Sequence, residues 1–368
     1  LLARALYIHW PYCIAKCPYC DFNSHVRKTA DMAEWKTALL ADMRHEFDAT
    51  GSEERLASIF FGGGTPSLMP PSLVADLLGE AERLWGFDPA IEITLEANPS
   101  SVEAAKFADL AERGLDHVQL SIQGVDGGTA DRIGGYKGGF EKKMEVADWI
   151  AKEGIPLTIN AVMHRQNLDR LADTIDLSVK LGARRLEVAH TQYHGWAYKN
   201  RTALMPTMGQ VKRGGEIVAE ARERLKGTLV IDYVTPDHLA DFPKPCMGGW
   251  ARVGLNVTPE GKVLPCHAAE TITTLEFENV KDRPLAEIWD NGDAFRAYRG
   301  VDWMQDPCQS CDRQAKDFGG CRCQAFAWTG DAAAVDPACS KSPLHGEMRA
   351  AAIADGEVQA DEFEYRLM

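Results

Sequence analysis

The sequence lacks features that would mark it as a membrane or nucleic-acid-binding protein. It contains no apolar run close to the roughly 20 residues that span a bilayer, and its net charge is −14 without a dense Lys/Arg cluster. Nucleic acids and anionic membrane surfaces attract basic patches, so neither is expected as a partner. The opening segment, LLARALYIHW, has no long apolar region followed by a cleavage site and predicts a strand, not a signal peptide. We expect a cytoplasmic protein.

Cysteine is missing from most of the chain and crowded elsewhere. Three cysteines lie between residues 13 and 20, and the other seven lie between residues 246 and 339. A reducing compartment keeps thiols free, so clusters at such close spacing favour metal or iron–sulfur ligands over disulfides.

Short apolar segments alternate with amphipathic segments from residue 5 to about residue 226. The strand candidates are 5–10, 58–63, 92–97, 117–122, 156–162 and 185–190, and helical patterns lie near 31–48, 71–85, 102–113, 139–153, 168–181 and 208–226. Repeated strand–helix units predict parallel strands with right-handed crossovers. Six units are fewer than the eight of a closed barrel. The predicted fold is α/β, a partial (β/α)6 TIM-type barrel with its chemistry at the carboxyl ends of the strands.

The pattern changes after this barrel domain, which we assign to residues 1–226. Cys, Gly and Pro punctuate a second domain, 227–353, in which residues 253–266 predict a hairpin around Pro-Glu-Gly. The acidic residues 354–368 are expected to form a loosely attached tail.

The first cysteine cluster, CIAKCPYC, follows the first predicted strand. Cys13, Cys17 and Cys20 supply three thiolates, which cannot close a tetrahedral zinc site and would leave one iron of a four-iron cluster open. This CX3CX2C spacing, with Tyr19 before the last cysteine, resembles the radical S-adenosylmethionine (radical SAM) superfamily. The resemblance implies a [4Fe-4S] cluster whose open iron is chelated by S-adenosyl-L-methionine, the source of a 5′-deoxyadenosyl radical. A zinc site completed by a distant His is the alternative.

Other residues at predicted strand ends become cofactor candidates through this resemblance. The segment FFGGGTP (60–66) implies that Gly62, Gly63, Gly64 and Thr65 line the methionyl end of the cofactor, because glycine lets backbone approach a ligand. Candidates for contacts with the ribose or carboxylate, besides Tyr19 in the loop, are Glu96, Ser121, Gln123 and Asn160. A salt bridge for Glu96 and backbone hydrogen bonds for Ser121 and Gln123 are the alternatives.

Aromatic and histidine side chains near the sixth strand and the second cysteine group have two interpretations. The residues His190, Tyr193, His194 and Trp196 either face a substrate tyrosine or pack in the core. His267 either tunes a cluster through a hydrogen bond or lies on the surface.

The later cysteines follow a second pattern. They form CX14GX4C (246–266), then CX2CX5DX3C (308–321), with Cys323 and Cys339 beyond. This resembles the SPASM extension of peptide-modifying radical SAM enzymes, which holds two auxiliary iron–sulfur clusters, either [2Fe-2S] or [4Fe-4S]. One set would be Cys308, Cys311, Asp317 and Cys339, and the other Cys246, Cys266, Cys321 and Cys323. Asp317 stands where the pattern has cysteine and would retune its cluster as a harder ligand; a solvated carboxylate, and a pair of zinc sites, are the alternatives.

Longer segments narrow the resemblance to one family. GLDHVQLSIQGVD (114–126), CDRQAKDFGGCRCQA (311–325) and DPACSKSPLH (336–345) resemble the PqqE family of pyrroloquinoline quinone (PQQ) biosynthesis, over about residues 112–368. The first hundred residues, with LYIHWPYCIAKCPYCDFNSH, look more like oxygen-independent coproporphyrinogen oxidases and haem chaperones. The chain therefore reads as a mosaic with a seam near 98–116.

The PqqE resemblance implies a peptide cyclase. It would be an oxidoreductase that forms a carbon–carbon bond between a Glu and a Tyr of the precursor peptide PqqA, with the chaperone PqqD and an electron donor such as a flavodoxin as partners. The alternatives are another SPASM peptide maturase, forming thioethers or oxidising Ser or Cys, and a non-catalytic haem chaperone.

Overall fold

One curved sheet of parallel strands organises the computed structural model, which describes residues 5–20, 22, 24–27, 29–50, 54–98, 104–193, 195–258, 260–358, 360 and 362–365. Its strand order is β1-β4-β5-β6-β7-β8-β9, and every neighbouring pair is parallel. The strands are β1 (Ala5–Trp10), β4 (Leu56–Gly63), β5 (Phe87–Ala97), β6 (His117–Ile122), β7 (Leu157–Met163), β8 (Arg185–His190) and β9 (Val230–Val234). Sequential strands are neighbours in space, as in a partial TIM-type barrel.

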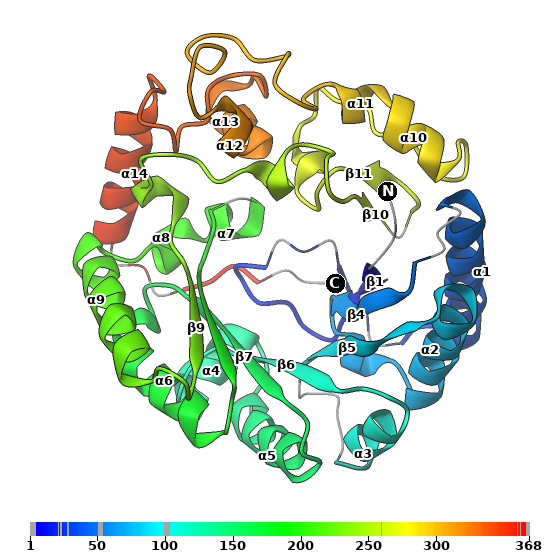
Figure 1. Ribbon diagram of the computed structural model, residues 1–368. Helices are drawn as coiled ribbons and strands as arrows, with labels where there is room; N and C mark the ends of the chain where they lie inside the picture. Colours follow the sequence, from blue (N-terminus) through cyan, green and yellow to red (C-terminus); the bar gives the residue numbers. More distant parts are fainter. Residues whose placement is uncertain are drawn as a thin grey trace.

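Helices cover the outer face of the sheet (Figure 1). They are α1 (Met32–Thr50), α2 (Pro71–Trp85), α3 (Ala104–Glu112), α4 (Gly127–Gly134), α5 (Gly139–Lys152), α6 (Leu171–Lys180) and α9 (Met208–Arg224). The short α7 (Gly195–Lys199) and α8 (Arg201–Leu204) lie between β8 and α9 in the chain and are not part of this outer layer. The barrel core lies between sheet and helices, where Phe61, Leu77, Leu95, Phe107 and Ile159 are almost fully buried. None of the helices within the described ranges is long and apolar enough to cross a bilayer.

The six predicted strands are present, and the structure adds elements that we did not predict, among them β9 and α4. β9 joins the sheet beside β8, so the barrel continues beyond residue 226 into the segment we had assigned to the second domain. It is an edge strand with one buried residue, and its sequence, VIDYV, carries an apolar, β-branched signal that our strand prediction overlooked. Helix α4 was also missed because it begins with two glycines; the Asp126 side chain caps it by accepting a hydrogen bond from Thr129 N at 2.9 Å.

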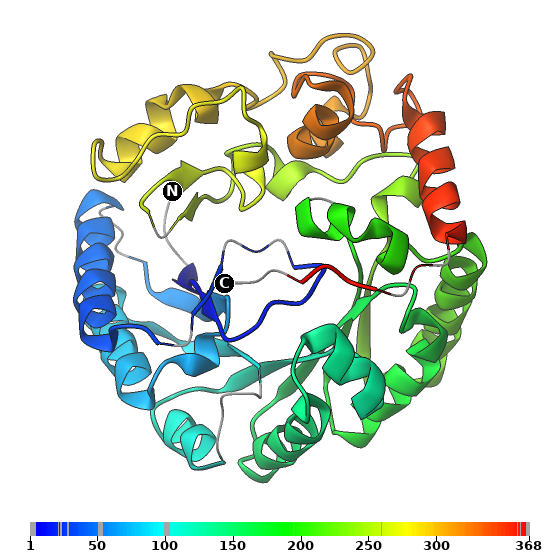
Figure 2. The same cartoon turned by 180° about the vertical axis from the view of Figure 1, so that it is seen from behind.

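The cysteine-rich segment spans the open side of the barrel, between β1 and β9 (Figures 1 and 2). The predicted hairpin is confirmed as β10 (Asn256–Val257) and β11 (Val263–Leu264), an antiparallel pair. The helices are α10 (Leu285–Asn291), α11 (Asp293–Arg296), α12 (Gln314–Asp317), α13 (Arg322–Thr329) and α14 (His345–Glu357). A second hydrophobic core, separate from that of the barrel, is built around Trp250, Val263, Leu264, Ile272 and Phe295.

The last described residues are not a loose tail. Residues up to Glu357 complete α14, and the chain then crosses the face of the barrel beside the first cysteine loop (Figure 1). The guanidinium of Arg165, just after β7, donates to the carbonyl oxygens of Asp355, Gly356 and Val358, and also to Thr202 and Met205. These anchors are mostly backbone carbonyls, which composition does not reveal, so the expectation of a loose tail was wrong.

Removing the Arg165 guanidinium should release this end of the chain. Hydrogen bonds to a charged group contribute about 1.5–3 kcal/mol each, so we expect Arg165→Ala to lower the free energy of unfolding by about 3 kcal/mol. It should also expose residues after Asp355 to protease. Limited proteolysis and chemical denaturation measure both effects. The matched control is Arg213→Ala, which removes an exposed pair with Asp169. An Arg165→Ala protein as protease-resistant as this control would contradict the assignment.

Candidate active site and iron–sulfur ligand groups

The first cysteine loop is closed at its base by backbone pairing. The short strands β2 (Tyr12–Cys13) and β3 (His25–Val26) are parallel partners. Backbone hydrogen bonds from His25 N to Pro11 O at 2.7 Å and from Arg27 N to Cys13 O at 2.9 Å join the two ends. The pairing fixes the ends of a loop that carries three thiols, so the thiol positions are set by the backbone.

The glycines at the end of β4 allow close packing against β1, and Gly64, just after the strand, allows it against the loop. Gly64 N donates to Trp10 O at 2.6 Å, and a Cβ on Gly64 would lie 2.6 Å from Tyr12 O. Gly63 has a φ of +107°, and a Cβ there would meet the ring of His9. Gly62 packs against Tyr7 on β1 in the same way. The three glycines thus have a packing role in addition to the predicted ligand role.

Most of the predicted cofactor residues surround one cavity of about 420 Å³ at the carboxyl ends of the strands. This volume lies in the range of small-molecule sites. The predicted residues that line it are Cys13, Cys17, Tyr19, Cys20, Gly63, Gly64, Thr65, Glu96, Ser121, Gln123 and Asn160. Gly62, as described above, packs against β1. The structure therefore brings together residues separated by up to 147 positions in the sequence.

A carboxylate that our sequence reasoning missed completes the polar wall of this cavity. Strand pairing sets Ser121, Asn160 and Glu187 side by side on β6, β7 and β8. Asn160 Nδ2 donates to Glu187 Oε2 at 2.7 Å, and Glu187 lines the cavity. The available signal was a charged residue inside the apolar strand RLEVAH. Gln119, also unpredicted, lines the same cavity.

The electrostatics of the loop suit an iron–sulfur centre. Burial raises the pKa of the Cys17 thiol and raises the pKa of Cys20 to about 12. Such thiols become thiolates when a strongly bound cation stabilises their charge, as iron does. Burial also raises the pKa of Glu96 to about 7, opposed by a hydrogen bond from Gly63 N at 3.2 Å and assisted by repulsion from Glu187. The donor set and the adjoining cavity fit a cluster with a nucleotide beside it.

The predicted aromatic cluster is divided by the structure. His190 lines the cofactor cavity and its Nε2 lies 3.0 Å from Tyr233 Oη. Tyr193 points into a neighbouring cavity, where it packs edge-on against His238 and donates to Leu204 O. The ring of Trp196 lies under the Lys199 ammonium, and His194 lies outside the described residues. His267 lines the cofactor cavity and packs against Phe22.

Four of the later cysteines form a connected group. Cys266 is hydrogen-bonded to Cys246 and to Cys323, and Cys323 is hydrogen-bonded to Cys321. Interaction with its neighbours lowers the pKa of Cys266, and interaction with Cys266 raises the pKa of Cys246 and Cys323. The members are the set Cys246, Cys266, Cys321 and Cys323 that we predicted for one auxiliary cluster.

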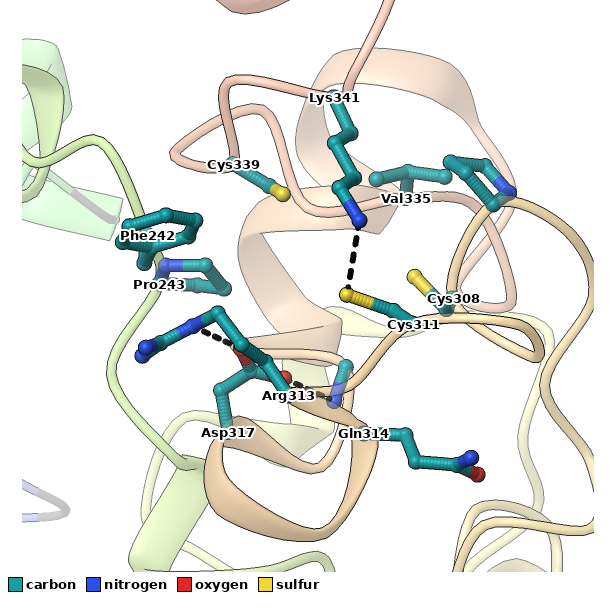
Figure 3. Close-up of a pocket in the computed structure, with 12 residues that line it drawn as sticks. Phe242, Pro243, Cys308, Cys311, Arg313, Gln314, Asp317, Val335, Cys339 and Lys341 are labelled. Carbon is teal, nitrogen blue, oxygen red and sulfur yellow. Dashed lines mark hydrogen bonds and ion pairs between the residues drawn. The ribbon is translucent and has the colours of Figure 1, made fainter.

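The other predicted set lines a separate small pocket (Figure 3). Cys308, Cys311 and Cys339 face Asp317, whose side chain is held by Gly319 N at 3.2 Å and by Arg313 Nε at 3.3 Å. Asp317 is 8% exposed, which does not match a solvated loop carboxylate. Lys341 Nζ lies 3.0 Å from Cys311 Sγ. Among the described residues, no three His, Cys, Asp or Glu side chains are placed so that they could bind one metal ion together.

Comparisons with known proteins identify two family domains in the chain and several similar proteins. Residues 7–178 match the family model of the radical SAM superfamily, and residues 246–312 match that of an iron–sulfur cluster-binding domain, SPASM. The PqqA peptide cyclase of Methylobacterium sp. (strain 4-46) is 49% identical over 96% of this chain and 90% of its own length. That of Rhizobium meliloti (strain 1021) is 47% identical over 91% of this chain and 86% of its own.

The chain belongs to the PqqA peptide cyclase family. It is therefore a radical SAM enzyme that uses iron–sulfur clusters and S-adenosylmethionine and acts on a peptide. Solved structures agree on the fold: Streptococcus suis SuiB bound to S-adenosylmethionine aligns with a TM-score of 0.65 at 19% identity, covering 90% of this chain and 76% of SuiB. SuiB bound to its precursor peptide SuiA aligns with a TM-score of 0.65 at 18% identity, covering 92% of this chain and 76% of SuiB.

The likeness to peptide cyclases is not confined to residues 112–368. A match over 96% of the chain includes most of the first hundred residues, which we had compared with coproporphyrinogen oxidases. The comparisons give no support to a mosaic.

The raised pKa of Glu96 predicts a pH dependence of stability in the cofactor-free protein. A pKa of about 7 in the folded protein, against an ordinary value of 4.5, costs about 3 kcal/mol of stability once the carboxyl group is ionised. The folded protein does not pay this free energy below pH 4.5, where the carboxyl group is protonated, and its free energy of unfolding falls by that amount as the pH rises toward 7. The difference in unfolding free energy between Glu96→Gln and the wild type should therefore grow by about 3 kcal/mol over this window. Denaturation at several pH values measures it, with Glu220→Gln on the exposed face of α9 as control. A constant difference would contradict the assignment.

Proposed function

We propose that this chain catalyses the PqqA peptide cyclase reaction of PQQ biosynthesis, the formation of a carbon–carbon bond between a Glu and a Tyr of the precursor peptide. The observation that carries the proposal is the 49% identity to a PqqA peptide cyclase over 96% of the chain. The gathering of the three-thiol loop, the glycine segment and the polar strand ends around one cavity supports it.

The roles of individual residues belong to the same proposal. Cys13, Cys17 and Cys20 would hold a [4Fe-4S] cluster with one open iron, and the cavity beside them would hold S-adenosylmethionine. Together these groups supply a carbon-centred radical that removes a hydrogen atom from the glutamate side chain. The protein's part is to hold the nucleotide: the backbone of Gly63 and Gly64 would face its methionyl end, and a row of polar side chains its other polar groups. That row is Glu96, Ser121, Gln123, Asn160 and Glu187.

The two later ligand groups would hold auxiliary clusters, either [2Fe-2S] or [4Fe-4S]. Restoring aromaticity to the tyrosine after ring addition requires the loss of one electron and one proton. An auxiliary cluster is a suitable electron acceptor, and its potential depends on its ligands. Asp317, as an oxygen ligand among thiolates, would set the Cys308 group apart from the all-cysteine group.

Partners and domain limits complete the proposal. The peptide would be PqqA, delivered by a PqqD-type chaperone, and electrons would come from a flavodoxin-type donor; the precursor peptide bound by the structural neighbour SuiB supports a peptide site in this fold. The barrel domain would extend from the amino-terminal region through β9, and the SPASM domain would follow it to about residue 353.

The proposal predicts a peptide-dependent product. Anaerobic protein reconstituted with iron and sulfide, then given dithionite, S-adenosylmethionine and PqqA with PqqD, should yield 5′-deoxyadenosine and a peptide lighter by two hydrogen atoms. Mass spectrometry measures both products. The triple variant Cys13→Ala/Cys17→Ala/Cys20→Ala should yield neither, because it lacks the first ligand set. Deoxyadenosine without any change in the peptide would disprove the substrate, and no deoxyadenosine from iron-loaded protein would disprove the enzyme.

The ligand role of Asp317 has its own test. Asp317→Ala should lower the bound iron by the content of one auxiliary cluster, whereas Asp317→Cys should retain the iron and change the electron paramagnetic resonance (EPR) spectrum of the reduced protein. Asp302→Ala, an exposed carboxylate in the same domain, is the matched control. Iron content and spectrum equal to wild type in Asp317→Ala would show that the carboxylate is not a ligand.

A further inference from the structure

A lysine that faces the first cysteine loop has no role in the function described so far. Lys143 lies in the middle of α5, and its side chain is 6% exposed. Its neighbour on the same helix, Lys142, points outward, pairs with Glu145 and lies over the ring of Trp149. Burying an ammonium is costly unless charge or hydrogen bonds compensate for lost hydration. The position of Lys143 therefore calls for a negative partner.

No carboxylate in the described part of the chain forms an ion pair with Lys143. The ammonium donates one hydrogen bond, to the side-chain oxygen of Gln123, which is neutral. Among the groups that would carry a negative charge, Cys17 acts on it most strongly, ahead of Asp131. Burial lowers the pKa of Lys143 to about 8, so the group is still mainly a cation at pH 7. Its partner is thus a thiol that becomes negative when it binds iron.

A row of neighbouring side chains joins the lysine to the loop. The Lys143 ammonium donates to Gln123 Oε1, and both Gln123 and Cys17 act on the phenol of Tyr19, whose side chain lies beside them. Lys143, Gln123 and Cys17 also line a cavity of about 30 Å³, which is distinct from the cofactor cavity and large enough for a water molecule. Lys143 and Cys17 therefore interact electrostatically, with Gln123 and Tyr19, two residues that we assigned to the cofactor site, beside them.

We propose that Lys143 is a positioning residue that supplies the countercharge for the first iron–sulfur centre and orients Gln123 and Tyr19 beside it. This rests on the proposed function, because it takes Cys13, Cys17 and Cys20 as cluster ligands. Reduction adds one electron to the centre from an external donor, dithionite or a flavodoxin-type protein, and no bond forms or breaks. A fixed cation nearby favours the more negative, reduced form, because opposite charges attract strongly where water is excluded.

The test is a redox titration of reconstituted full-length protein, followed by EPR. The signal of the first centre is identified as the one that changes on adding S-adenosylmethionine. Lys143→Met removes both charge and hydrogen bond, and Lys143→Gln removes the charge but keeps an amide donor. At the potential that half-reduces the wild type, both neutral variants should show a reduced-to-oxidised ratio at least about tenfold lower, a shift of about 59 mV for a one-electron couple. Lys143→Arg and the control Lys142→Met should stay near wild type.

Each outcome decides the question. Iron-loaded Lys143→Met and Lys143→Gln with the wild-type midpoint would overturn the inference and leave the proposed function standing. If neither neutral variant binds iron but Lys143→Arg does, the charge is required even for cluster assembly, which supports the inference. If Lys143→Arg also fails to bind iron, the role is packing and the inference falls. A wild type with no signal that responds to S-adenosylmethionine would instead overturn the proposed function.

Discussion

The structure depends on holding three thiols in a buried loop while leaving space on one side of them. The backbone pairing of β2 with β3 closes the base of the loop, and Gly64, just after β4, lets the loop lie against the sheet at a distance that excludes a Cβ. The outer side of the loop is held by Asn200, whose amide donates to Pro18 O and to Glu364 O and accepts from Glu364 N. The paired base of the loop, the sheet and the carboxyl-terminal segment thus constrain the thiols on three sides, and the cavity lies on the side that is left open.

The chain as a whole is acidic, yet cations lie beside the thiols of the first loop and of the Cys308 group. Lys16 lowers the pKa of Cys20 against the effect of burial, and Lys143 does the same for Cys17. Lys341 contacts Cys311, and Arg322 acts on Cys308 while its guanidinium donates to the carbonyl oxygens of Ala332 and Ala334. Buried thiolates need such countercharges whether or not they share a cluster. The net charge of −14 is that of the whole chain, whereas these thiols have cationic side chains beside them.

Sequence reasoning recovered what is encoded locally and missed what depends on contacts between distant residues. The parallel strands follow from apolar runs, and the division of the later cysteines into two groups follows from their resemblance to the SPASM pattern. Glu187 and Lys143 were missed because each is an ordinary charged residue in its own strand or helix and becomes notable only through its neighbours across the barrel. The carboxyl-terminal segment was misjudged for the same reason, since its anchors are an arginine and an asparagine about 200 and 160 residues away.

The cysteine-rich domain contributes directly to the wall of the cofactor cavity. His267 and Ala268 line the cavity, and Cys266, next to them in the chain, belongs to the all-cysteine group. The wall is therefore continuous with a member of that group, whereas Cys308, Cys311, Asp317 and Cys339 surround a different pocket. On the proposed function, the Cys266 group would be the auxiliary ligand set that adjoins the cavity. Because two residues of this domain belong to the wall, the cavity has its final shape only when the domain is folded onto the barrel.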